Sequence, residues 1–85
     1  MIAPADRFGP WAPDLDHAER LARLRSLRAI THLCTGSRGD RLAAELRQAE
    51  QDAARLPAAL NELNALAALD RRQVLASFAR LHRST

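Results

Sequence analysis

Apolar residues recur three and four positions apart along most of this chain, and that spacing limits its fold more than any other feature. The clearest stripe alternates steps of four and three through the middle of the sequence, at Leu42, Leu46, Ala49, Ala53 and Leu56. Such residues share one narrow face of a helix. No segment shows the alternation of apolar and polar residues that a half-buried strand requires. The pattern predicts an all-α fold, a small antiparallel bundle of three helices, or of four.

Proline and capping residues divide the sequence into segments. Residues 1–13 hold three of the four prolines and are expected to form an extended arm, because proline disfavours helix in the residue before it. A single helical domain then covers residues 14–85. Asp16 and Glu19 have the spacing of a capping box at the start of its first helix. We predict helices over residues 15–34, 40–56, 57–69 and 71–83.

The sequence leaves two of these boundaries open. Pro57 would remove a backbone hydrogen bond inside a helix. The apolar stripe nevertheless resumes in phase at Leu60, so a kink or a tight corner is expected instead of a long loop. Asp70 and Gln73 have capping-box spacing, although the apolar face continues in phase across them. Residues 57–83 are therefore either one helix or two helices that join at Asp70, and the capping spacing favours two.

The first helix carries more apolar surface than one neighbouring helix can cover. Its apolar residues recur every third position, so the stripe winds around the helix. Two faces result, one with Leu15, Ala18 and Ala22 and another with Leu27, Ile30 and Cys34. Either the helix crosses its neighbour steeply or it has two partners, one of which could be another chain. Large aromatic side chains are restricted to Phe8, Trp11 and Phe78, so the core is thin and self-association or a partner chain is expected to stabilise it.

Charge is unevenly distributed, and all thirteen basic residues are arginine. The net charge is −3 over residues 1–19, +5 over 20–41, −2 over 42–69 and +3 over 70–85. The arginines of the basic segment could bind the phosphates of a nucleic acid. Alternatively, they could meet carboxylates, either in the acidic middle of this chain or on a partner protein. The second interpretation is favoured because the arginines do not share one helix face and few aromatic residues are available to stack on bases. A basic face that is merely solvated is the third alternative.

The residues that could carry chemistry do not form a recognisable site. His32 and Cys34 are two positions apart and face away from each other on a helix, so a thiolate–imidazole pair is not expected. The three histidines, His17, His32 and His82, are too dispersed to indicate a metal site, and no zinc-binding spacing is present. We therefore expect no enzymatic activity, no cofactor and no metal.

The composition also bears on location. No apolar stretch approaches the length that spans a bilayer, so no membrane contact is expected. Residues 1–13 lack a basic segment followed by an apolar run, which argues against a secretory signal. With Cys34 as its single cysteine, the chain cannot form an internal disulfide. These features predict a cytoplasmic protein of a bacterium or of a phage-infected cell.

The sequence predicts a small non-catalytic module for protein–protein interaction, such as a regulator, an inhibitor or an assembly chaperone that binds a partner protein. The alternative is a small basic DNA- or RNA-binding regulator, and a homo-oligomer is a further option. Phe8 and Trp11 are expected either to cap the core of their own domain or to dock on a partner. The predicted partner-binding residues are Phe8, Trp11, Arg20, Arg23, Leu27, Arg28, Ile30, Arg38 and Arg41.

Overall fold

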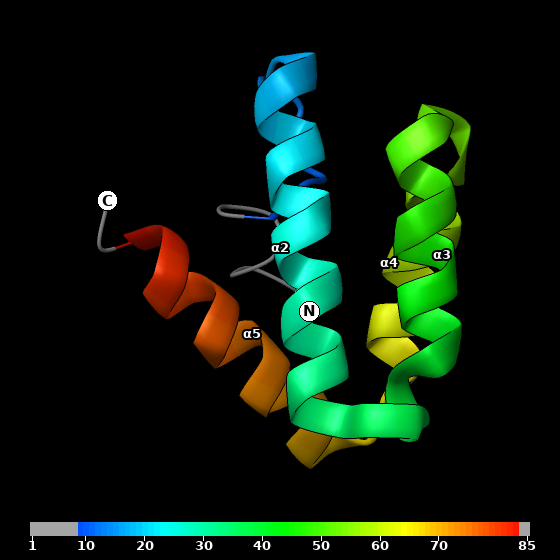
Figure 1. Cartoon of the computed structure of the whole chain (residues 1–85), viewed down its shortest axis with the longest axis vertical. Coiled ribbons are helices and arrows are strands. Elements are labelled where there is room, and N and C mark those ends of the chain that lie inside the picture. The colour runs from blue at the N-terminus through cyan, green and yellow to red at the C-terminus, as the bar shows by residue number, and fades with distance from the viewer. Residues whose placement is uncertain (1–8, 84–85) are drawn as a thin grey trace.

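The computed structural model describes residues 9–83, which form helices and turns and no strand. The elements in chain order are α2 (His17–Thr35), the 3-10 turn η1 (Gly36–Gly39), α3 (Asp40–Gln51), the 3-10 turn η2 (Ala53–Arg55), α4 (Leu56–Ala65) and α5 (Ala68–Arg83). The helices α2, α3 and α4 run alternately down, up and down, and α5 leaves them at an angle (Figure 1). The prediction of a small all-α bundle is confirmed.

The start and end of α2 follow from local hydrogen bonds. The Asp16 carboxylate accepts a hydrogen bond of 2.7 Å from the backbone N–H of Glu19, which satisfies a donor that the first helical turn leaves unpaired. The predicted N-terminal cap is therefore confirmed. At the other end Gly36 has φ 57°, a conformation that glycine adopts without a steric penalty, and its N–H reaches the carbonyl of His32.

The corner between α3 and α4 lies earlier than predicted. Asp52 has extended backbone angles and its carboxylate accepts a hydrogen bond of 3.0 Å from the N–H of Ala54, so α3 ends at Gln51 and not near residue 56. Pro57 then occupies the first turn of α4, where its missing N–H breaks no helical bond. The expected tight corner is present, but Asp52 makes it, and Pro57 begins the next helix.

The C-terminal part of the chain consists of two helices, as the capping spacing predicts, but they do not join at Asp70. The backbone is extended at Leu66, and α5 begins at Ala68. Asp70 therefore lies inside the first turn of α5 and does not cap it. Arg71 stabilises this corner by donating hydrogen bonds to the carbonyls of Asn64 and Leu66, at 3.0 and 3.2 Å.

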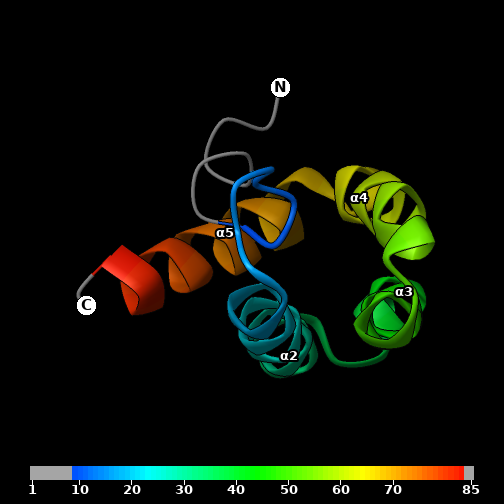
Figure 2. The same cartoon turned by 90° about the horizontal axis from the view of Figure 1, so that it is seen from above.

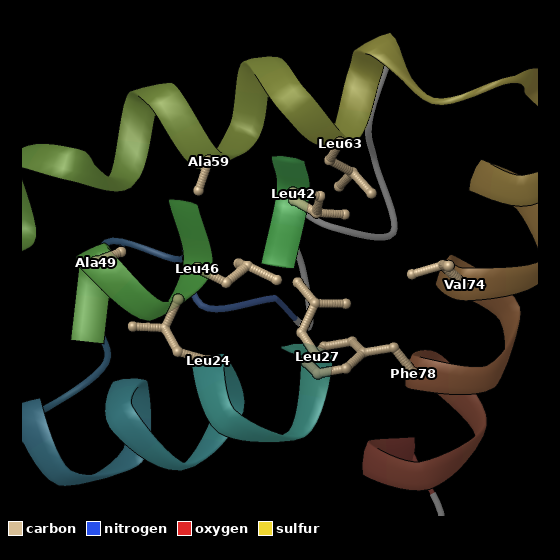
Figure 3. Packing of buried hydrophobic residues seen from close by; sticks show 9 residues of the cluster. All are labelled: Leu24, Leu27, Leu42, Leu46, Ala49, Ala59, Leu63, Val74 and Phe78. Carbon is tan, nitrogen blue, oxygen red and sulfur yellow. The ribbon is translucent and has the colours of Figure 1, made fainter. Parts of the chain in front are cut away.

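Side chains from all four helices meet in one buried cluster. Figure 3 shows its members, which are Leu24, Leu27, Leu42, Leu46, Ala49, Ala59, Leu63, Val74 and Phe78. Phe78 has the largest side chain among the fully buried residues and is 2% exposed. The winding stripe of α2 is covered by two neighbours from the same chain, α3 and α5. Part of the apolar surface of α2 stays exposed, since Leu33 is 83% exposed and Ala18 and Ala22 of the first predicted face are also at the surface.

A close approach between η1 and α2 requires glycine at position 39. Thr31 and Thr35 are both buried, and their hydroxyls donate to the carbonyls of Leu27 and Thr31, at 2.8 and 2.7 Å. A Cβ atom on Gly39 would overlap Thr35 Oγ1 and would lie 2.7 Å from Thr31 Cγ2. The turn can therefore fold back on the last turns of α2 only without a side chain at this position.

The described part of the predicted arm, residues 9–13, is a turn and is not extended. The N–H of Ala12 donates to the carbonyl of Gly9 at 3.3 Å. Arg20 on α2 donates to the carbonyls of Pro10 and Ala12, at 2.9 and 2.7 Å, and these bonds hold the turn against the helix. The indole N–H of Trp11 donates to the carbonyl of Leu56 at 2.8 Å. This segment thus closes the side of the core between α2 and α4 (Figure 2).

The far end of α5 is joined to α2 through His82. Its Nε2 lies 3.2 Å from the Ser26 hydroxyl, and its ring centroid is 4.3 Å from that of Phe78. Burial lowers the pKa of His82 below the 6.5 of an ordinary histidine, and the charge of Arg23 lowers it further, against a smaller opposite effect of Glu19. The folded protein therefore favours the neutral imidazole.

This shift predicts how stability depends on pH. Between the two pKa values the unfolded chain binds a proton that the folded chain does not, so the His82 contribution is complete above pH 6.5 and is lost as the pH falls through the folded value. We expect His82→Gln to reduce the loss of stability between about pH 8 and about pH 5. Chemical unfolding of both proteins at both pH values measures this difference. An equal loss in the two proteins would contradict the assignment.

Candidate functional site

The structure does not bring the predicted partner-binding residues together on one surface. Leu27 is 1% exposed and belongs to the core, so it is not available to a partner, contrary to its place in the predicted set. Ile30 is half-buried and packs on the same core. Trp11 and Arg20 are engaged in holding residues 9–13, which agrees with the interpretation that Trp11 caps its own domain. Phe8 lies outside the described residues.

Two further arginines of the predicted set form ion pairs within the chain. Arg23 lies 3.3 Å from Glu19, one turn earlier on α2. Arg38 on η1 donates to both carboxylate oxygens of Asp70 on α5, at 2.9 and 3.0 Å. The hydrogen bond from Arg38 lowers the pKa of Asp70 and raises that of the guanidinium. Arg41 is exposed and lines a small cavity of about 230 Å³ beside this pair.

The candidate site is a groove between α2 and α3, with a volume of about 690 Å³. Its cationic and titratable side chains are Arg25, Arg28 and His32 from α2 and Arg47 from α3. Its apolar lining consists of Ala29, Ala43 and Ala44. We call this region the basic groove. The two helices that form it run antiparallel and side by side (Figures 1 and 2).

Helix geometry explains why these residues meet. Arg25, Arg28 and His32 are spaced three and four positions apart, so they line one edge of α2. Arg47 stands opposite, one turn beyond Ala43 and Ala44 on α3. The alanine methyl groups are too short to fill the space between the longer side chains. The basic groove therefore results from short alanine side chains that lie among longer cationic ones.

One carboxylate, Glu50, moderates this charge. Its side chain is only 10% exposed, and Oε2 lies 2.8 Å from Nε of Arg28, while Oε1 lies 3.6 Å from Nε of Arg25. The Nε–H of Arg28 is not aligned with Oε2, so charge holds these two atoms together without a well-directed hydrogen bond. A longer hydrogen bond of 3.5 Å joins Arg28 Nη2 to Oε1. The basic segment thus meets acidic residues of its own chain in part, as one of the sequence interpretations allowed.

Among the lining residues of the basic groove, only Arg28 belongs to the predicted partner-binding residues. The spacing of Arg25, Arg28 and His32 along one helix edge was a visible signal for two of the missing residues. No comparable signal marks Arg47, because it lies in the acidic part of the sequence and reaches the groove only through the packing of α3 on α2.

Other kinds of site find no support in the part of the chain that the structure describes. Within residues 9–83, no three His, Cys, Asp or Glu side chains are grouped so that they could hold a metal ion. None of the helices there has both the length and the apolar character needed to cross a bilayer. No protein-family model, curated protein or solved structure matches this chain. The basic groove is therefore identified by its geometry and charge alone.

Proposed function

We propose that this protein is a small non-catalytic binding module whose basic groove takes an acidic segment of a partner protein. In that role it would act as a regulator, an inhibitor or an assembly chaperone in the cytoplasm of a bacterium or a phage-infected cell. The observation that supports this proposal is the convergence of Arg25, Arg28 and Arg47, from two helices, on a groove with an alanine lining.

Shape and charge together favour an amphipathic helix as the bound segment. Alanine side chains allow a third helix to approach α2 and α3 closely, and a leucine or similar residue on its inner face can fill the space above them. Glutamate or aspartate residues along its edges would then reach the guanidinium groups. Arginine suits this contact because its planar fork can form two parallel hydrogen bonds with one carboxylate.

A charge-reversal experiment tests the proposal. The probe is a fluorescein-labelled amphipathic peptide with a leucine stripe flanked on both sides by glutamate. We expect the double variant Arg25→Glu, Arg47→Glu to bind it at least about tenfold more weakly than the wild type, because opposite charges at the groove become like charges. Fluorescence anisotropy measures the affinity, and circular dichroism confirms that the fold is retained.

The chain offers a control with the same net charge. Arg72 and Arg80 are exposed on α5, outside the groove lining, so the double variant Arg72→Glu, Arg80→Glu should bind within about twofold of the wild type at moderate salt. Equal losses in the two double variants would show that overall charge, and not the groove, governs binding. Binding of the wild type to short duplex DNA but not to the peptide would replace the proposal with the nucleic-acid alternative.

A further inference from the structure

We infer that Glu50, which lies outside the lining of the basic groove but contacts two of its arginines, determines the specificity of the groove. It weakens the affinity of the groove for nucleic acid and leaves the affinity for acidic protein segments unchanged. The inference rests on the proposed function, since it concerns the selectivity of the same groove. Glu50 is the one carboxylate that the structure places within 4 Å of two groove arginines, among the residues it describes.

The position of Glu50 gives its charge a direct effect on the groove. Its side chain is nine-tenths buried, so its charge is only partly screened by solvent. Arg25 and Arg28 have 64% and 37% of their side chains exposed, so both present an outer edge to a ligand while their inner side faces Glu50. The carboxylate therefore reduces the positive potential of the groove without blocking access to it.

Nucleic acid and acidic protein segments respond differently to this reduction. Affinity for a nucleic acid depends mainly on the number of phosphates that cationic groups neutralise. The groove has three arginines, Arg25, Arg28 and Arg47, and Glu50 offsets one of their three positive charges. It therefore removes a large share of the electrostatic affinity for phosphates. The affinity for a carboxylate ligand depends more on the direction of individual guanidinium groups. Glu50 restrains the guanidinium of Arg28 through the 2.8 Å ionic contact and the 3.5 Å hydrogen bond from Nη2 to Oε1. For a carboxylate ligand, the affinity gained from the restrained guanidinium offsets the affinity lost through the reduced positive charge.

The variant Glu50→Gln tests this assignment because it removes the charge and keeps the shape. We expect it to bind short duplex DNA about five- to tenfold more tightly than the wild type. The slope of the logarithm of its DNA affinity against the logarithm of the salt concentration should be steeper by about 0.9, because one more phosphate is neutralised. Its affinity for the glutamate-flanked peptide should stay within about threefold of the wild type.

Two further variants separate the position of the charge from its presence. Glu45 lies on the same helix and accepts hydrogen bonds of 2.8 and 2.9 Å from Arg55, which is not one of the groove arginines. Glu45→Gln therefore has the net charge of Glu50→Gln and should bind DNA as the wild type does. Glu50→Asp keeps the carboxylate and should also retain wild-type selectivity. If Glu50→Gln does not fold, Glu50→Met provides an uncharged side chain of similar length.

The outcomes distinguish this inference from the proposed function. Equal DNA affinities of the position-50 and position-45 variants would overturn the role of Glu50 and leave peptide binding intact. A peptide affinity that rises by the same factor as the DNA affinity in Glu50→Gln would show that Glu50 weakens the binding of every acidic ligand, which also contradicts selectivity. Failure of the arginine reversal to weaken peptide binding would refute the function itself.

Discussion

Replacement of Phe78 by alanine is expected to lower the free energy of unfolding by about 3–5 kcal/mol. Phe78 is 2% exposed and lies in the core beside Leu27, where α5 packs on α2. The other residues of the buried cluster are leucine, valine and alanine, so none of them has a side chain as large as the one removed. Small domains have a total stability of about 5–15 kcal/mol, so this variant should be close to unfolding.

Urea unfolding followed by circular dichroism measures the effect of Phe78→Ala. Leu69→Ala is the matched control on the same helix, because Leu69 is 75% exposed and its truncation should change stability by about 0.5 kcal/mol or less. If the two variants unfolded at the same urea concentration, α5 would not be part of the core. This result would contradict the packing of α5 against α2.

Replacement of Trp11 by alanine is expected to have the second largest effect, a loss of about 2–3 kcal/mol. Trp11 is half-buried against the core, and its indole N–H donates to the carbonyl of Leu56. The substitution removes both the ring and the hydrogen bond that ties residues 9–13 to α4. The cost should be smaller than that of Phe78→Ala, because part of the ring already faces solvent.

The variant Trp11→Phe separates the two contributions, since it keeps an aromatic ring and loses the hydrogen bond. We expect it to lose about 1 kcal/mol. Circular dichroism is the suitable signal for both variants, because Trp11 is the single tryptophan and its removal abolishes tryptophan fluorescence. An unchanged unfolding midpoint for Trp11→Ala would show that the segment does not stabilise the domain, which would return Trp11 to the role of a docking residue.

Much of the fold could be predicted from the sequence because helical spacing is a local property. The stripe that contains Leu42, Leu46 and Ala49 appears in the structure as one buried face of α3. Asp16 was also recognisable as a cap, since its partner Glu19 is three residues away. The predicted ends of two helices are wrong, because α3 and α4 end where the backbone becomes extended at Asp52 and Leu66. Neither a glycine nor a capping-box spacing in the sequence marks these two positions.

The candidate site was less predictable because it depends on contacts between distant residues. Arg20 looked like a surface cation, but the turn at residues 9–13 folds back and uses its guanidinium. Leu27 looked like part of an uncovered stripe, but α5 returns from the end of the chain to cover it. Arg47 gained its place in the groove only when α3 packed beside α2. In each case tertiary packing, and not helix periodicity, decides which side chains a partner can reach.

Mapping of peptide binding by nuclear magnetic resonance tests the location of the binding surface most directly. On titration with the glutamate-flanked peptide, the backbone amides of Ala29, Ala43 and Ala44 should show the largest shift changes, because these residues line the basic groove. Amides of α5 around Arg72 and Arg80, on a different helix, should change little. If the largest changes lay on α5 or at residues 9–13 and the groove alanines stayed constant, the basic groove would not be the binding site.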